Sequence, residues 1–171
     1  MKGIIVAALS LTLATVAAAD SGVALVKGTT PESKVSGTVT FHDMKGGLHV
    51  SVQLTGLTPG DHAFHIHEFG SCEDVGKAAG SHYNPLSSPH GFLPKDGMHK
   101  AHSGDMGNIL AAADGSASLE VMLPRVTLAE GKYTVAGRAV IVHEKKDDFS
   151  QPVGNAGGRV GCGIIVITGG K

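Results

Sequence analysis

The amino-acid sequence predicts an all-β fold, either an antiparallel sandwich or a barrel. Short segments of alternating polar and apolar residues recur along the chain, and residues typical of turns separate them. Few windows have a sustained helical period, and the best of them, residues 127–132, is too short to be more than a turn. The 25 glycines and the absence of tryptophan suit short strands joined by tight turns.

Seven segments have the strand pattern: residues 35–41, 48–54, 62–67, 108–112, 116–122, 133–142 and 162–167. Turns are predicted at residues 44–47 (MKGG), at 58–61 (TPGD) and at the Asp114-Gly115 pair, which is typical of a hairpin. Two long segments, residues 68–106 and 144–161, interrupt this spacing. Irregular segments of that length in a compact domain are usually functional or disordered. Because the first contains a cysteine and four histidines, we expect functional loops.

The first nineteen residues have the features of a cleavable export signal. Lys2 supplies a positive charge, residues 4–16 are apolar, and three alanines precede Asp20. The apolar run is short for a membrane span, which needs about 20 residues. We therefore expect residues 1–19 to be removed on export, and residues 20–171 to form one domain without a membrane anchor.

Charge and cysteine content narrow the possible partners. The formal net charge is −1 and no run of lysine or arginine occurs, so no nucleic-acid partner is predicted. The two cysteines, Cys72 and Cys162, favour one disulfide in an exported chain. Their use as metal ligands is the weaker alternative, because they lack the close spacing of zinc-binding cysteine pairs.

The ten histidines are the main functional signal. His65 and His67 lie two residues apart in a predicted strand, so both side chains point to one face, with their backbones about 7 Å apart. HSGD at residues 102–105 places an imidazole and a carboxylate close together around a glycine. Four more histidines complete the set: His82, His90 and His99 in the first long loop, and His143 after the predicted strand at 133–142.

These residues predict two metal ions. A site made only of imidazoles suits copper, which has two accessible oxidation states, and three histidines with one aspartate suit tetrahedral zinc. Two four-coordinate sites need eight ligand positions, but the set has seven residues when only one of His99 and His102 is used. One histidine must then bind through both ring nitrogens. His82, the loop histidine nearest to the His65/His67 strand, is the natural candidate.

Five segments occur in order along the chain: GLTPGDHAFHIH (56–67), GSHYNP (80–85), HSGDMGN (102–108), VHEK (142–145) and GNAGGRVGCG (154–163). Together they resemble the signature of the copper,zinc superoxide dismutases, and the position of Cys72 resembles that of the family's bacterial branch. The resemblance implies an eight-stranded antiparallel Greek-key barrel or sandwich, of immunoglobulin-like type, with two long functional loops.

The resemblance also implies one copper ion and one zinc ion per subunit. Copper would be bound by His65, His67, His82 and His143. Zinc would be bound by His82, His90, His102 and Asp105. His99 stays open as the alternative to His102, because the spacing after His90 is longer than the common pattern of the family.

Three further roles follow from the resemblance. Arg159 would attract the substrate beside the copper, and Cys72 would form the disulfide with Cys162. Asp147 would link a copper-ligand histidine to a zinc-ligand histidine; its alternative role is a solvated charge in a turn.

The implied enzyme is an oxidoreductase that converts superoxide, a small-molecule substrate, to oxygen and hydrogen peroxide by copper redox cycling. Zinc would be a structural and tuning ion, and His82 and Arg159 the catalytic residues. The alternative is a non-catalytic copper- and zinc-binding or copper-delivery protein on the same fold.

We expect a homodimer, with a monomer as the alternative. We also expect export to the periplasm, with the extracellular space as the alternative. The other strand histidines, His42, His49 and His62, are expected to be ordinary surface or core residues.

Overall fold

The computed structural model describes residues 20–170, so the export signal predicted at residues 1–19 lies outside the described part of the chain. Nine strands and two single-turn helices form within the described range. The strands are β1 Ser21–Gly28, β2 Ser36–Met44, β3 Gly47–Thr55, β4 Gly60–His67, β5 Asp105–Ala111, β6 Ala117–Pro124, β7 Ala139–His143, β8 Arg159–Ile164 and β9 Val166–Gly169. The helices are η1 Lys77–Ala79 and α1 Leu93–Asp96.

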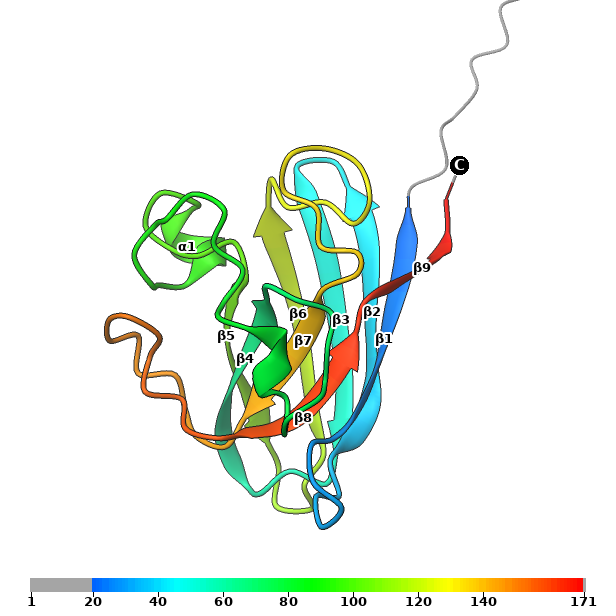
Figure 1. The fold of residues 1–171 in the computed structure, drawn as a ribbon, viewed down its shortest axis with the longest axis vertical. Helices are drawn as coiled ribbons and strands as arrows, with labels where there is room; N and C mark the ends of the chain where they lie inside the picture. The colour runs from blue at the N-terminus through cyan, green and yellow to red at the C-terminus, as the bar shows by residue number, and fades with distance from the viewer. Residues whose placement is uncertain (1–19, 171) are drawn as a thin grey trace, which may run out of the picture.

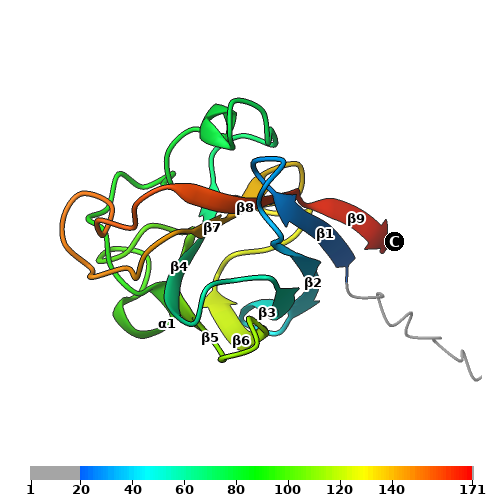
Figure 2. The same cartoon turned by 90° about the horizontal axis from the view of Figure 1, so that it is seen from below.

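The strands form a closed antiparallel barrel. Their order is β2-β3-β6-β5-β4-β7-β8-β1, and pairing of β1 with β2 closes the ring (Figures 1 and 2). β9 follows β8 after Ile165 and also pairs with β1, so β8 and β9 act as one interrupted strand. The predicted all-β fold with an eight-stranded antiparallel barrel is therefore confirmed.

Two parts of the strand prediction were wrong. β1 was missed because Gly22, Ala24 and Val26 face inward while Val23 and Leu25 face outward, so hydropathy does not alternate along it. The predicted strand at 133–142 is a strand only from Ala139 onward. Residues 133–138 contain a bend, an isolated bridge of Thr134 with Thr127 and a turn, and the alternation there reflects the burial of Tyr133 and Val135.

The barrel interior is filled by the inward residues of the paired strands. Val39 and Phe41 of β2 pair with Val52 and Val50 of β3, and all four side chains are fully buried. Dense packing of this kind makes the barrel a rigid support. Both long loops, residues 68–104 and 144–158, lie on the side of the barrel away from β2 and β3 (Figures 1 and 2).

A disulfide attaches the first loop to the barrel. Cys72 in the loop is bonded to Cys162 on β8, with a sequence separation of 90 residues. The disulfide predicted from the cysteine count is thus confirmed. Between residues 20 and 170, none of the helices has the length and apolar character needed to cross a membrane.

Candidate metal centre

Four imidazoles meet where β4 lies beside β7. His65 and His67 are on β4, His143 ends β7, and the two strands pair antiparallel. The first long loop then returns to β4, where His82 forms an isolated bridge with His67. One nitrogen atom from each of the four rings lies within 4.8 Å of the others, and all four side chains are buried.

A second group shares one member with the first. It contains His82, His90, His102 and Asp105, all buried. Asp105 begins β5, and its carboxylate oxygens lie 2.8 Å from the Nδ1 atoms of both His82 and His90. The Nδ1 of His102 is 3.2 Å away, and the backbone N–H groups of Gly91 and His102 donate to the same carboxylate. His82 is thus common to both groups, as the ligand count predicts.

Gly104 lets the loop approach β4 closely. Its N–H donates to the Tyr83 carbonyl, and its own carbonyl accepts from the Ile66 N–H, both at 2.9 Å. A Cβ atom at position 104 would collide with the carbonyl oxygen of Ile66. The glycine of the HSGD segment therefore brings His102 and Asp105 against the strand that carries the first group.

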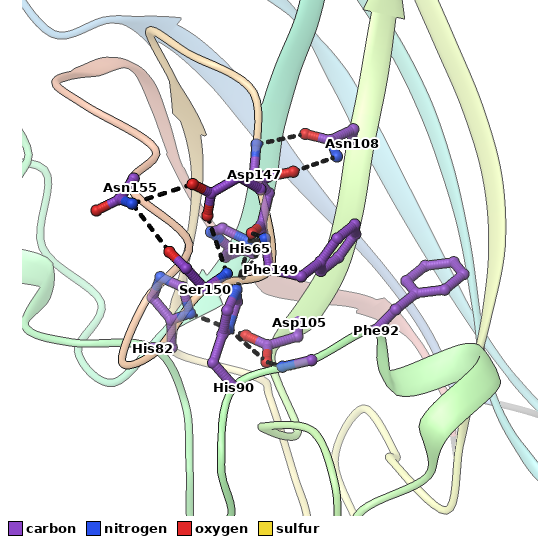
Figure 3. A network of polar contacts seen from close by, with 12 residues as sticks. His65, His82, His90, Phe92, Asp105, Asn108, Asp147, Phe149, Ser150 and Asn155 are labelled. Atoms are coloured by element: carbon purple, nitrogen blue, oxygen red, sulfur yellow. Dashed lines mark hydrogen bonds and ion pairs between the residues drawn. The ribbon is translucent and has the colours of Figure 1, made fainter.

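Asp147 connects the two groups from the second long loop. Its Oδ2 lies 2.8 Å from the Nε2 of His65, and its Oδ1 lies 2.9 Å from the Nε2 of His90. Figure 3 shows Asp147 in the second loop beside His65 and His90. Asp147 is fully buried, so it is not a solvated charge in a turn.

Asp147 is itself positioned by three neighbours. Asn108 on β5 accepts from the Asp147 N–H at 2.7 Å and donates to the Asp147 carbonyl at 3.0 Å (Figure 3). The N–H of Phe149 donates to Oδ1 of Asp147 at 2.8 Å. Gly154 has a φ of +72°, and a Cβ there would collide with Oδ1. The second loop is thus folded around this carboxylate.

Sequence analysis did not find the residues that orient the ligand histidines. Gln151 accepts from the His90 N–H at 2.9 Å and donates to the His90 carbonyl at 2.8 Å. The Phe149 ring stacks on His90, with centroids 6.2 Å apart. Asn108 could have been identified from the sequence, because it is the last residue of the HSGDMGN segment. Nothing in the sequence around Gln151 indicates its contact with His90.

Burial keeps three imidazoles uncharged. Burial lowers the pKa of His67 far below its usual range, and that of His143 to about 2. It also lowers the pKa of His82 to about 4, outweighing the hydrogen bond with Asp105. Neutral imidazoles present a free lone pair, which is the form that binds metal ions.

His90 and the two carboxylates carry charge in the absence of metal. Burial lowers the pKa of His90, but the carboxylates of Asp105 and Asp147, close to its two ring nitrogens, outweigh this effect and raise the pKa to about 9. Burial raises the pKa of both carboxyls, but their hydrogen bonds with histidines are stronger and hold it well below the usual range. A divalent cation entering the second group would displace the His90 proton and leave Asp105 as the anionic ligand.

Three buried nitrogens test whether metal ions fit. The Nδ1 atoms of His65, His90 and His143 have no hydrogen-bond partner within residues 20–170. The Nδ1 of His90 is 2.8 Å from Asp105 but is not aligned for a hydrogen bond. A buried polar atom without a partner costs about 1–3 kcal/mol. Asp147 contacts the Nε2 atoms of His65 and His90, so their Nδ1 atoms are the ones available to bind a metal ion. A metal ion in each group would give these buried nitrogens a partner.

Arg159 lies at the opening to the first group. An opening of about 430 Å³ is lined by the rings of His67, His82 and His143 together with Arg159. The guanidinium donates to the carbonyl of Gly80 at 2.6 Å and to that of Gly76. These bonds fix a half-buried positive charge beside the opening.

Two other histidines have clear positions. His99 is exposed and belongs to neither group among the described residues, whereas His102 is buried in the second group. His62 lies behind the first group, where its Nδ1 is 2.7 Å from the carbonyl oxygen of His143. Its Nε2 is 2.8 Å from the Thr58 carbonyl, so both nitrogens are used within the core.

The geometry defines a class of protein: an antiparallel β-barrel with a buried centre for two metal ions, built from six histidines and one aspartate. The sequence model of the family described as copper/zinc superoxide dismutase (SODC) matches residues 35–165. This chain belongs to the copper/zinc superoxide dismutase family, and its histidine groups fit the copper and zinc of that family.

Curated proteins with similar sequences have matching names. "Superoxide dismutase [Cu-Zn] 2" of Mesembryanthemum crystallinum is 42% identical over 151 residues, covering 84% of this chain and 92% of the relative. "Superoxide dismutase [Cu-Zn] 3" of Arabidopsis thaliana is 41% identical over 151 residues, covering 84% and 88%. "Extracellular superoxide dismutase [Cu-Zn]" of Brugia pahangi is 40% identical over 144 residues, covering 78% and 70%.

Proposed function

We propose that this chain converts two superoxide anions and two protons into one dioxygen and one hydrogen peroxide. The observation that carries the proposal is the pair of buried ligand groups that share His82, with Arg159 at the opening. The chain is thus an oxidoreductase of the superoxide dismutase class. A copper-delivery protein on this fold would need no anion-attracting arginine beside a complete ligand set.

The ligand assignment follows the two groups. Copper is assigned to His65, His67, His82 and His143, and zinc to His82, His90, His102 and Asp105. Bound copper would supply one-electron redox chemistry, and bound zinc a fixed charge without redox activity.

The protein's own residues supply binding and proton transfer. Arg159 attracts the anion to the opening and positions it beside the first group. Asp105 accepts from Nδ1 of His82, so Nε2 of His82 is left facing the first group. We assign Nε2 of His82 as the atom that takes up and releases a proton during turnover. Asp147 keeps the rings of His65 and His90 in one orientation.

Metal analysis and an activity assay on one sample test the function. The purified protein, loaded with both metals, should contain one copper and one zinc per chain and remove superoxide. Chelation should abolish the activity, and restoring copper should recover it. Full occupancy by both ions without activity would contradict the proposal and favour the metal-binding or copper-delivery alternative.

Replacing Arg159 by Ile should lower the rate of superoxide removal by about tenfold at low ionic strength, because the attraction at the opening is lost. Copper content should stay unchanged, since within residues 20–170 the Arg159 guanidinium donates to loop carbonyls and not to a ligand histidine. Arg159→Lys should recover part of the rate, and Lys100→Ile, which removes a positive charge at an exposed position, is the control. An unchanged rate in Arg159→Ile at low salt would remove Arg159 from the mechanism.

We infer a homodimer that uses the outer side of β1, β8 and β9. Leu25, Ile164 and Val166 are 63%, 40% and 50% exposed, and they line an apolar groove of about 420 Å³ beside the disulfide. Exposed apolar patches of this kind commonly mark protein interfaces.

Sedimentation equilibrium should show that the unmodified protein is a dimer and that Leu25→Glu converts it to a monomer. The control Leu110→Glu, 67% exposed on β5, should remain dimeric; a monomeric unmodified protein would contradict the inference.

We also propose export, with residues 1–19 as the signal and residues 20–171 as the mature domain, ending in the periplasm. The disulfide supports export, because such bonds persist in oxidising compartments. N-terminal sequencing of the mature chain and fractionation of the source cells test the proposal. A chain that begins at Met1, or one found in the cytoplasm, would contradict it, and recovery from the medium would replace the periplasm by the extracellular space.

A further inference from the structure

A second set of metal-binding side chains lies on the outer face of the barrel, on β2, β3 and β6. His42 on β2 is the direct cross-strand partner of His49 on β3, and His49 is the partner of Met122 on β6. Cross-strand partners project on the same face of a sheet. Two imidazoles and a thioether therefore lie in one row across three strands.

A carboxylate adjoins this row. Glu120 lies two residues before Met122 on β6, so it faces the same side, and its Oε2 is 3.0 Å from the Nε2 of His49. The hydroxyl of Ser51 donates to the other carboxylate oxygen and orients it. An imidazole and an oriented carboxylate are thus already in contact on the outer surface.

The side chains of the row are accessible and far from the metal centre already described. His42 is exposed, His49 is 34% exposed, Glu120 is 58% exposed and Met122 is 38% exposed. In both views of the barrel, β2 and β3 lie on the side away from the two long loops (Figures 1 and 2). None of these four residues belongs to either ligand group.

We propose that His42, His49 and Glu120 form a third, solvent-exposed site for a divalent late transition-metal ion, with Met122 at its edge. Directly opposed residues on antiparallel strands have Cβ atoms about 4.5–5.5 Å apart, a spacing from which two imidazoles can reach one ion. Imidazole and carboxylate ligands suit zinc, nickel and copper(II), and copper(II) binds most tightly among these at a given site.

Ion binding requires only local rearrangement. Nδ1 of His42 is hydrogen-bonded to the Ser21 hydroxyl at 3.2 Å, and the ring of His49 contacts Glu120. Both contacts are at the surface, where a salt bridge contributes about 0–1 kcal/mol. Exchanging these weak contacts for metal–nitrogen bonds needs rotation of exposed side chains and no movement of the buried barrel.

Titration with nickel(II) tests the site on the full chain without an affinity tag and with copper and zinc already bound in the main centre. Isothermal titration calorimetry should detect one additional nickel ion per chain. His42→Gln and His49→Gln should each weaken its binding by about tenfold or more, because the second imidazole of a chelating pair binds at high effective concentration. His99→Gln, which removes an exposed histidine outside the row, should leave binding unchanged.

Location and independence are checked on the same variants. Nickel(II) should broaden the NMR signals of residues on β2 and β3 near the row, such as Thr40 and Ser51, and not those at the opening beside Arg159. Superoxide removal should be the same in all three variants, so the result does not depend on the proposed activity. No additional nickel bound, or equal binding in His42→Gln and the unmodified chain, would overturn the proposal.

Discussion

Replacing Asp105 by Ala should reduce zinc affinity more than any other single change at the centre, by at least about 100-fold, since loss of even an outer-shell partner costs 10–100-fold. The carboxylate contacts His82, His90 and His102 and accepts two backbone N–H groups. Without it, the buried His90 loses one of the two carboxylates that raise its pKa against the lowering effect of burial. We expect the variant to keep the barrel and lose the order of the first loop.

The measurement is zinc content after dialysis, together with the free energy of unfolding. The metal-free Asp105→Ala protein should be less stable by about 3–5 kcal/mol, the cost of breaking a buried charged pair. Asp114→Asn, in an exposed hairpin turn, is the matched control and should keep full zinc. Zinc should also be lost in His102→Ala and kept in His99→Ala. Retention of zinc in Asp105→Ala, or its loss only in His99→Ala, would contradict the assignment.

Removing the disulfide should lower the free energy of unfolding by about 4–5 kcal/mol, as the chain-entropy model gives for a closed loop of this length. The same loop supplies the carbonyls of Gly76 and Gly80 that receive the Arg159 guanidinium. We therefore expect Cys72→Ala to slow superoxide removal as well, even when copper remains bound.

Urea unfolding of the metal-free protein measures the stability change. Cys72→Ala, Cys162→Ala and the double variant break the same bond, so their losses should be similar, with a small extra cost at the buried Cys162. Ser71→Ala, next to the first cysteine, is the matched control. A loss below about 1 kcal/mol in the double variant would show that the loop is held by other contacts.

The fold was predictable where burial alternates along a strand. Apart from the exposed Met44 at the end of β2, β2 and β3 place their apolar side chains on the inner face, so their pairing followed from the sequence. β1 was not predictable in this way, because small residues face the core while Val23 and Leu25 face outward. In residues 133–138, the burial of Tyr133 and Val135 produces a strand-like alternation of polar and apolar residues. These residues do not pair along a neighbouring strand, and β7 begins only at Ala139.

The site was predictable where ligand chemistry and local spacing agree. Two histidines on one strand face and the HSGD segment indicated the two groups, and counting ligands pointed to His82. The residues that position these ligands were harder to find. Gln151 and Phe149 act on His90 across about sixty residues of chain, and ordinary polar or aromatic residues in a loop have no signature of such contacts.

The sharing of His82 has a thermodynamic consequence. Because one ring belongs to both groups, and Asp147 contacts His65 as well as His90, an ion in either group organises ligands of the other. The free energy of this coupling must be the same in both directions. Zinc bound first would raise copper affinity by the same factor as copper bound first raises zinc affinity. The centre is therefore expected to load as a cooperative unit, with half-filled chains scarce at intermediate metal concentrations.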